Sequence, residues 1–364
     1  MTASRRAAQV VTAVLAMWSA TAVAVGLPAE AHFLIYGLAG SALIVLATYP
    51  SRLTAFVLLS GGCLLFPLNP APVREALSVE PGLPLAYVGL AAVIYSAIRS
   101  LRGPTPEGFL TGVFGIPAFI LLLTPVHSLI IWATPHTLDP ALYRIDTAIF
   151  GELTFATGRV LANHRWVQVL SGWCYLALAL VGSGLYAVSL RGRTGHVLPA
   201  ELLWGWAAAG AIGAIGYLLV PAVGPRFVFR EWPWHMPDAT GTYATPLLPI
   251  PRNAMPSLHA TWALLICWGA REAPGWVKWL LGPWLVLTLL ATVGAGGHYV
   301  IDVVAALPLT WVAAWAGARL TAVKLARMGS AAQSGVPTVW FAVAERATRT
   351  VPKRPRHCAP RYRP

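Results

Sequence analysis

The chain has 364 residues, of which 57% are hydrophobic and 11% are charged, and it contains 16 tryptophans. Soluble domains carry about 25% charged residues, so this composition excludes an ordinary soluble protein and favours a polytopic helical membrane protein. The net charge is +13, but ten of the 26 Lys and Arg residues lie from Arg319 onward, and no basic stripe interleaved with aromatic residues precedes them. Orientation in a membrane explains this distribution better than a nucleic-acid partner, which is therefore not expected.

Ten apolar stretches are candidates for membrane-spanning helices. They cover residues 10–27, 32–49, 53–67, 83–98, 109–134, 167–190, 201–221, 259–271, 279–295 and 299–320. The first could instead be a signal peptide, because Ala29-Glu30-Ala31 resembles a cleavage site. Its apolar region is long for that role and further spans follow, which favours a retained helix. The sequence thus predicts an all-α polytopic membrane protein with about ten transmembrane helices.

The basic residues also predict the orientation of these spans. With the N-terminus inside, 19 of the 26 Lys and Arg residues lie on the cytoplasmic side, as the positive-inside rule requires. We therefore expect a multi-pass plasma-membrane protein with both termini in the cytoplasm. The long loops 135–166 and 222–258 are then extracytoplasmic. We expect the first to contain a short helix lying on the membrane and the second to be a lid or a binding surface.

The chain is expected to consist of three parts. Residues 1–105 hold about four N-terminal transmembrane helices, residues 106–322 hold the remaining six, and residues 323–364 form a basic cytoplasmic tail. The tail is rich in Arg and Pro, which favours a partly disordered segment near anionic lipid over a folded domain.

A histidine and an aspartate at helical spacing form the first candidate site. His298 and Asp302 are four residues apart at the start of the last apolar stretch, so they share one helix face. A carboxylate bonded to one ring nitrogen fixes the tautomer and makes the other nitrogen a better nucleophile. His259 lies 39 residues earlier, room for one helix, a turn and a returning helix. A lone histidine at a membrane edge is usually structural, but this combination favours catalysis.

The segment Pro256-Ser257-Leu258-His259 has the pattern of a helix start. The free amides of a first helical turn bind anions, and His259 at this place can protonate a leaving oxygen. Ser257 could also be a simple N-cap, a role that does not need the histidine.

Two arginines are candidates for binding phosphate oxygens. Arg226 follows Gly224-Pro225 where a span leaves the membrane, and its guanidinium can bind two oxygens at once. An arginine in this place can also sit among lipid headgroups. Arg252 is a weaker candidate of the same kind.

The remaining histidines have no comparable partners and are expected to be interfacial or incidental. They are His32, His127, His136, His164, His196, His235 and His357. No acidic cluster suggests a catalytic metal, so neither a metal nor a cofactor is expected.

In order and spacing, these motifs resemble those of the type-2 phosphatidic acid phosphatase superfamily, which are membrane enzymes with a six-helix core. The second motif of that family, Pro-Ser-x-His, fits at residues 256–259, and the third, His-x-x-x-Asp, fits at His298 and Asp302. Residues 109–320 supply six spans with the motifs at the matching places. The resemblance does not cover residues 1–105.

The motifs also depart from the common pattern of that superfamily. Gly224-Pro225-Arg226 stands in place of the lysine-led first motif, and Ala291 and Thr292 replace the Ser-Arg pair of the third. With Tyr299 after the histidine, these variants are closer to the inositol phosphorylceramide synthase and sphingomyelin synthase branch, which moves phospho-headgroups between lipids.

The resemblance implies a two-step in-line phosphoryl transfer. His298, oriented by Asp302, would attack phosphorus, and His259 would protonate the leaving group. The phosphate oxygens would be bound by Arg226 and by the first-turn amides around Ser257, with Arg252 as a further candidate.

The implied donor is a lipid phosphate, and the branch favours a lipid or sugar hydroxyl as acceptor. Two alternatives remain open. A lipid phosphate phosphatase acting on phosphatidate or a polyprenyl phosphate would use the same residues with water as acceptor. A non-enzymatic transporter of anionic lipid is disfavoured, because inverted repeats are not evident and ionisable residues are nearly absent from the span centres.

Overall fold

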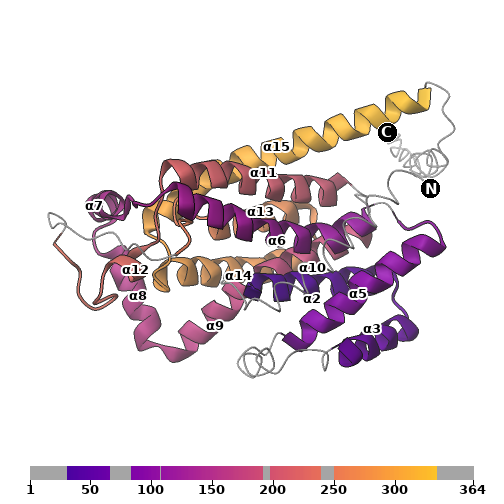
Figure 1. The fold of residues 1–364 in the computed structure, drawn as a ribbon, viewed down its shortest axis with the longest axis horizontal. Helices are drawn as coiled ribbons and strands as arrows, with labels where there is room; N and C mark the ends of the chain where they lie inside the picture. The colour runs from indigo at the N-terminus through magenta and orange to yellow at the C-terminus, as the bar shows by residue number, and fades with distance from the viewer. Residues whose placement is uncertain (1–30, 66–82, 107, 192–196, 239–249, 334–364) are drawn as a thin grey trace, which may run out of the picture. The chain divides into compact units, whose positions relative to one another are not determined.

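The structure is a computed structural model that describes residues 31–65, 83–106, 108–191, 197–238 and 250–333. Within these ranges every regular element is a helix (Figure 1). The first predicted span and most of the predicted tail lie outside the described residues. The other nine predicted apolar stretches all form helices, so the expected all-α membrane fold is confirmed.

The described helices follow one another along the chain with short connections. They are α2 (Ala31–Thr48), α3 (Arg52–Leu65), α5 (Leu83–Arg102), α6 (Phe109–Ala133), α7 (Asp139–Phe150), α8 (Leu153–Asn163), α9 (Arg165–Leu176), α10 (Leu178–Arg191), α11 (Val197–Leu219), α12 (Pro225–Val228), α13 (Leu258–Gly269), the 3₁₀ turn Ala270–Glu272, α14 (Gly275–Gly294) and α15 (Val300–Gln333).

Five of the described helices are long and apolar enough to cross a membrane. They contain the segments Pro84–Arg102, Phe109–Ala133, Ala200–Leu219, Gly275–Gly294 and Val300–Val323. Helices α9 and α10 meet at an angle of 53° and qualify as a sixth span only as a bent pair. Helices α2, α3 and α13 are apolar but shorter than the ~20 residues that a full crossing needs. Several predicted spans are therefore shorter or more bent than their apolar stretches suggested.

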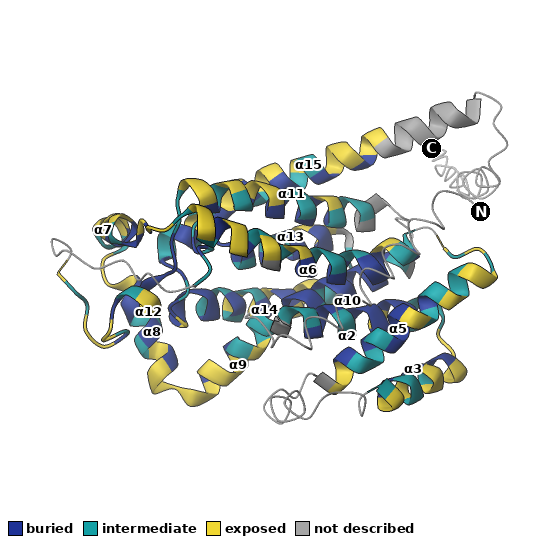
Figure 2. Cartoon of the chain, in the orientation of Figure 1, coloured by how far each residue is buried: buried dark blue, intermediate teal, exposed yellow. Residues whose placement is uncertain are grey.

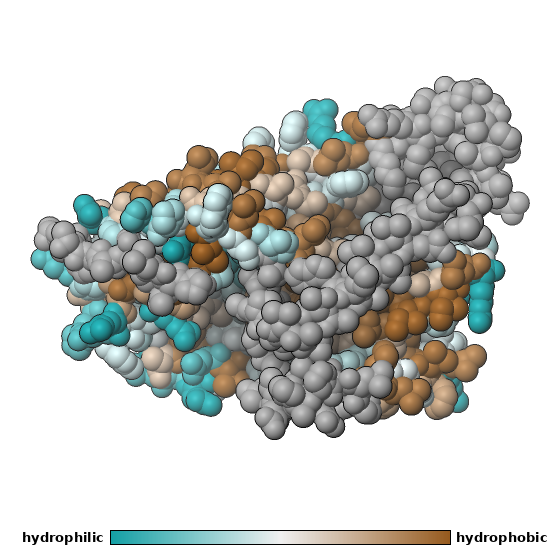
Figure 3. Space-filling model, viewed as in Figure 1, coloured by the Kyte–Doolittle hydropathy of each residue, from teal (hydrophilic) through white to brown (hydrophobic). Residues whose placement is uncertain are grey.

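Burial follows the pattern expected of helices packed side by side in lipid. Buried residues lie on the helix faces that meet inside the bundle (Figure 2). Large apolar side chains such as Leu53, Trp132 and Trp279 are exposed, and apolar residues cover much of the outer face (Figure 3). A soluble protein rarely exposes so many large apolar side chains, whereas lipid tails solvate them.

Helix α13 is the inner element of the core. Eight of its twelve residues are buried, and it packs against α10, α11 and α14. Helix α2 packs against α5, α6 and α10, so an N-terminal helix contacts the predicted six-helix core directly. The residues up to Arg319 belong to one compact unit, and Leu320–Pro364 belong to a second. The predicted division of the chain into three parts stays a prediction.

One end of the bundle gathers the segments that hold the predicted site residues. Helices α6 and α11 end there, α13 and α15 begin there, and α7, α8 and α12 cover it (Figure 1). The loop predicted to hold one short helix contains two, α7 and α8. Helix α7 begins at Asp139-Pro140 and ends at Gly151, whose φ of 60° suits glycine, so the chain has clear start and stop signals here.

Candidate active site

His298 lies just before α15 and is fixed by hydrogen bonds to two distant segments. Its Nδ1 lies 2.8 Å from the carbonyl oxygen of Ala254. Because a carbonyl can only accept, we assign the ring proton to Nδ1, which leaves a lone pair on Nε2. Nε2 lies 3.4 Å from the hydroxyl of Ser257. The nucleophilic nitrogen thus faces the beginning of α13, and the ring is 5% exposed.

Asp302 contributes less to the histidine than its spacing suggested. Its Oδ2 lies 3.6 Å from His298 Nδ1, which is an ionic contact but longer than a hydrogen bond. The same oxygen accepts the amide of Tyr299 at 2.8 Å, and the backbone carbonyl of Asp302 accepts the amide of Ser257 at 3.1 Å. Asp302 therefore joins the start of α15 to the start of α13, while Ala254 provides the hydrogen bond that orients His298.

Ser257 is the N-cap of α13, as the simpler interpretation of its motif predicted. Its hydroxyl accepts the amide of Ala260 at 3.3 Å, which satisfies one free donor of the first turn. It also faces His298, so the cap residue is part of the site as well.

His259 follows on the first turn of α13, and its ring is 6.3 Å from the ring of His298, centroid to centroid. The ring stacks on Tyr175 at 4.2 Å. Its Nε2 is buried and has no hydrogen-bond partner among the described residues. A buried polar atom without a partner is costly, so this nitrogen is suited to meet a ligand.

The two candidate arginines lie in different environments. Arg226 is exposed, and its backbone amide donates to the carbonyl of Gly296 at 3.0 Å. This bond places Arg226 beside the segment that carries His298. Arg252 is only 2% exposed, and its guanidinium donates to the carbonyl of Ile250 at 2.9 Å. Arg252 therefore holds its own loop, and a direct role in binding phosphate stays a prediction.

The sequence analysis missed Asp139, which joins α7 to the segment that carries Arg226. The carboxylate of Asp139 is buried and accepts the amides of Val223 at 3.0 Å and Gly224 at 2.8 Å. It also accepts the hydroxyl of Tyr299 at 3.3 Å. Burial and the nearby carboxylates of Asp139 and Asp302 raise the pKa of Tyr299 well above its usual value, so Tyr299 remains a donor.

A second missed aspartate on the same helix binds the beginning of α15. Asp146 accepts the amide of Ile301 at 2.8 Å and the hydroxyl of Thr154, whose oxygen in turn accepts the amide of Val300 at 3.1 Å. A carboxylate at a helix N-terminus satisfies free amides and interacts favourably with the helix dipole. Burial raises the pKa of Asp146 above its usual value, and these hydrogen bonds oppose that rise.

The two aspartates and Thr154 thus form what we call the α7 brace. Only the Asp-Pro helix start and the spacing of seven residues on one face gave a local signal for them. Their partners lie in segments that the sequence does not connect.

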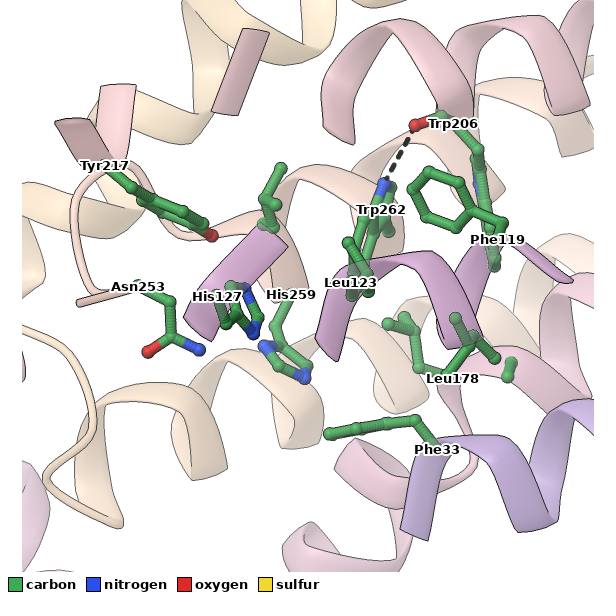
Figure 4. Close-up of a pocket in the computed structure, with 13 residues that line it drawn as sticks. Phe33, Phe119, Leu123, His127, Leu178, Trp206, Tyr217, Asn253, His259 and Trp262 are labelled. Carbon is green, nitrogen blue, oxygen red and sulfur yellow. Dashed lines mark hydrogen bonds between the residues drawn. The ribbon is translucent and has the colours of Figure 1, made fainter. Parts of the chain in front are cut away.

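His127 corrects an expectation. It was grouped with the incidental histidines, but it is 7% exposed and lines a cavity together with His259. It comes from α6, one turn and a half before the helix ends. No helical spacing relates it to His259, so only the tertiary structure brings the two together (Figure 4).

Among the described residues no group of three or more His, Cys, Asp or Glu side chains is placed to hold a metal ion. The site within these residues consists of two imidazoles, a helix N-terminus and carboxylates that bind backbone amides. Such a site can carry out nucleophilic and acid–base chemistry.

Comparison with known proteins agrees with the motifs. The family model of the PAP2 superfamily matches residues 140–316, and this match supports placing that part of the chain in the superfamily. Members of the superfamily are phosphoryl-transfer enzymes, either phosphatases or phosphotransferases, in agreement with the enzyme class predicted from the motifs. No curated protein and no solved structure matches the chain. The synthase-like branch stays a prediction.

Proposed function

We propose that this membrane protein transfers a phosphate or phospho-headgroup from a lipid donor to a hydroxyl acceptor through a phosphohistidine at His298. The observation that carries the proposal is the fixed ring of His298. Its Nδ1 donates to a backbone carbonyl, and its Nε2 points at the first turn of a helix. The match to a superfamily of phosphoryl-transfer enzymes supports the same class of reaction.

In the first step the lone pair on Nε2 of His298 attacks phosphorus, and the bond from phosphorus to the leaving oxygen breaks. His259 gives its proton to that oxygen. The separation of 6.3 Å between the two ring centres leaves room for a phosphoryl group between them. The amides at the start of α13 and the guanidinium of Arg226 stabilise the charge on the equatorial oxygens.

In the second step the oxygen of the acceptor hydroxyl attacks phosphorus, and the bond to Nε2 breaks. His259 takes the proton of the hydroxyl, so both histidines return to their starting states. Water in place of the acceptor would make the enzyme a lipid phosphatase. The same residues serve both reactions, and the motif variants Thr292 and Tyr299 favour transfer.

The proposed setting is the plasma membrane, with the site on the extracytoplasmic side. The excess of basic residues in the predicted cytoplasmic loops supports this orientation. The proposed partners are therefore a lipid-phosphate donor and a lipid or sugar hydroxyl acceptor at the outer surface.

The purified enzyme should be given labelled phosphatidate or polyprenyl phosphate, with and without a panel of hydroxyl acceptors. The expected result is a labelled phosphodiester or phosphomonoester of one acceptor, formed faster than inorganic phosphate. Inorganic phosphate as the sole product across the panel would replace transfer with hydrolysis. Absence of any label on His298 after rapid acid-free quenching would contradict the phosphohistidine itself.

A further inference from the structure

A cavity of about 50 Å³ lies inside the helix bundle beside His259. One water molecule needs roughly 10–15 Å³ of such space, so the cavity can hold several heavy atoms. It is lined by Phe33, Phe119, Ile120, Leu123, His127, Leu178, Ala179, Trp206, Tyr217, Asn253, Leu258, His259 and Trp262.

The lining of this cavity is amphipathic. His127, Asn253 and His259 lie together on one side, and aromatic and aliphatic side chains such as Phe119 and Leu178 line the other (Figure 4). Apolar cavities in proteins stay dry and accept apolar ligands. A ligand that fills this cavity therefore has a hydrocarbon part, and its polar part lies at the histidines.

Much of the cavity wall comes from helices that precede the family match. Phe33 belongs to α2, and its ring lies 4.7 Å from the ring of His259, centroid to centroid. Phe119, Ile120, Leu123 and His127 belong to α6. The match begins only at residue 140, so these helices add to the site something that the matched region lacks.

Helix α2 is held firmly in this place by close backbone approaches. A Cβ on Gly40 would lie 2.1 Å from the hydroxyl oxygen of Ser183 in α10, and one on Gly37 would lie 2.7 Å from the end of Ile120 in α6. A Cβ on Gly89 of α5 would lie 2.0 Å from the carbonyl oxygen of Leu38. Only glycine allows contacts this close, so α2 is a fixed wall of the cavity.

We propose that this cavity binds the hydrocarbon chain of the lipid substrate next to the reacting phosphate, and that α2 and α6 determine which chains fit. The inference rests on the proposed function, because it takes the lipid of that reaction as the occupant. The chain is already solvated by lipid before it binds, so the hydrophobic effect gives little preference. Selection comes from shape, and a well-packed apolar pocket discriminates roughly tenfold or more for one methylene group.

The test changes the size of the cavity and measures the preferred chain. Phe33→Ala enlarges it, and Leu123→Trp reduces it. The matched controls are Phe56→Ala on α3 and Leu122→Trp on α6, because both side chains are exposed on the outer face, at 67% and 63%. The purified full-length variants are compared on phosphatidates with saturated chains from hexanoyl to palmitoyl and with one methyl-branched chain.

We expect Phe33→Ala to move the preference, measured as kcat/KM, toward longer or branched chains by roughly tenfold relative to wild type. Leu123→Trp should move it toward shorter chains, and the two controls should keep the wild-type profile. A wild-type enzyme whose variants change all chain lengths by one common factor would overturn the inference while leaving the proposed function intact.

A second measurement does not depend on turnover. A long-chain alcohol that carries a diazirine near its terminal methyl group is crosslinked to wild type and to His298→Ala, and the modified peptides are identified by mass spectrometry. Crosslinks at Leu123 and Leu178 in both proteins are expected. Crosslinks confined to outward residues such as Leu122 would contradict a chain site in the cavity, even if the proposed reaction failed as well.

Discussion

At the scale of single residues, the orientation of His298 depends on a carbonyl group and not mainly on the aspartate four residues later. Ala254 accepts the Nδ1 proton at 2.8 Å, whereas Asp302 lies 3.6 Å away. The carbonyl of Ala254 cannot be altered by exchanging its side chain, so this orientation survives most single substitutions. Asp302 retains two roles, as a nearby negative charge for the imidazolium and as the acceptor for the amide of Tyr299.

The first prediction concerns the proposed nucleophile and acid. His298→Ala should lower kcat on the order of 10³-fold or more, since a covalent nucleophile is lost. His259→Ala should lose most on donors with poor leaving groups, because these depend most on protonation. His235→Ala is the matched control, as that side chain is 77% exposed. More than a few per cent of wild-type activity in His298→Ala would show that the nucleophile is misassigned.

The second prediction concerns Asp146 as a positioning residue. An asparagine in its place can accept only one of the two hydrogen bonds, and its amide group then faces a donor. Since Asp146 acts through the start of α15 and not on the lipid, Asp146→Asn should lower kcat about 10-fold to 100-fold with little change in KM. Glu152→Gln, an exposed change in the neighbouring turn, should leave both values near wild type. A rise in KM with unchanged kcat would contradict positioning.

The pH dependence of stability gives a second readout for the same variant. Burial raises the pKa of Asp146 above 3.8, so the native state binds this proton more tightly than the unfolded chain does. The contribution of Asp146 to stability therefore falls as the pH rises above 3.8 and until it passes the raised pKa. Asp146→Asn should lack this fall, and Tm measured against pH in detergent compares the two proteins.

At the scale of elements, the site is assembled where one helix bridges two motifs. Through Asp139, the α7 brace binds the segment before Arg226, and through Asp146 and Thr154 it binds the start of α15. Between those two segments the backbones meet closely: a Cβ on Gly224 would lie 2.3 Å from the carbonyl oxygen of Gly297. The proposed phosphate-binding arginine and the proposed nucleophile are thus held against each other by backbone contacts.

The third prediction tests this contact. Gly224 has a φ of +94°, so Gly224→Ala combines backbone strain with a steric clash and should destabilise the protein by about 1–3 kcal/mol. Gly282→Ala in α14 is the control, because a Cβ there meets nothing within 4 Å and alanine favours the helix by up to about 1 kcal/mol. Thermal unfolding in detergent should therefore show a lower Tm for the first variant and an equal or higher Tm for the second.

At the scale of the whole molecule, the outer face is apolar and the polar site lies at one end of the described helices. This end holds the loops after α6, α11 and α14 (Figure 1). The loops at the other ends of these helices carry basic residues such as Arg102 and Arg271. The proposed orientation places the first end outside and the second in the cytoplasm.

The fourth prediction checks that orientation with single cysteines in a background without native cysteines. Arg230 and Arg102 are both exposed in the structure, and they lie on opposite sides in the proposed topology. Arg230→Cys should react with a membrane-impermeant maleimide on intact cells, whereas Arg102→Cys should react only after permeabilisation. Labelling of Arg102→Cys on intact cells would reverse the proposed topology.

Local patterns in the sequence were enough to predict the helices and part of the site. Long apolar stretches form helices in lipid because each helix satisfies its own backbone hydrogen bonds, and the nine described stretches do so. The Pro256-Ser257 start of α13 and the shared face of His298 and Asp302 were also predictable, since capping and helical spacing act over a few residues.

How those pieces meet could be learned from the three-dimensional fold alone. The bond from Ile301 to Asp146 joins residues 155 positions apart, and that from Tyr299 to Asp139 joins residues 160 apart. The contact of Phe33 with His259 depends in the same way on how α2 packs against the core. Local patterns carry no information about such partners, because hydrogen bonds and packing between distant segments follow from how whole helices fit against each other.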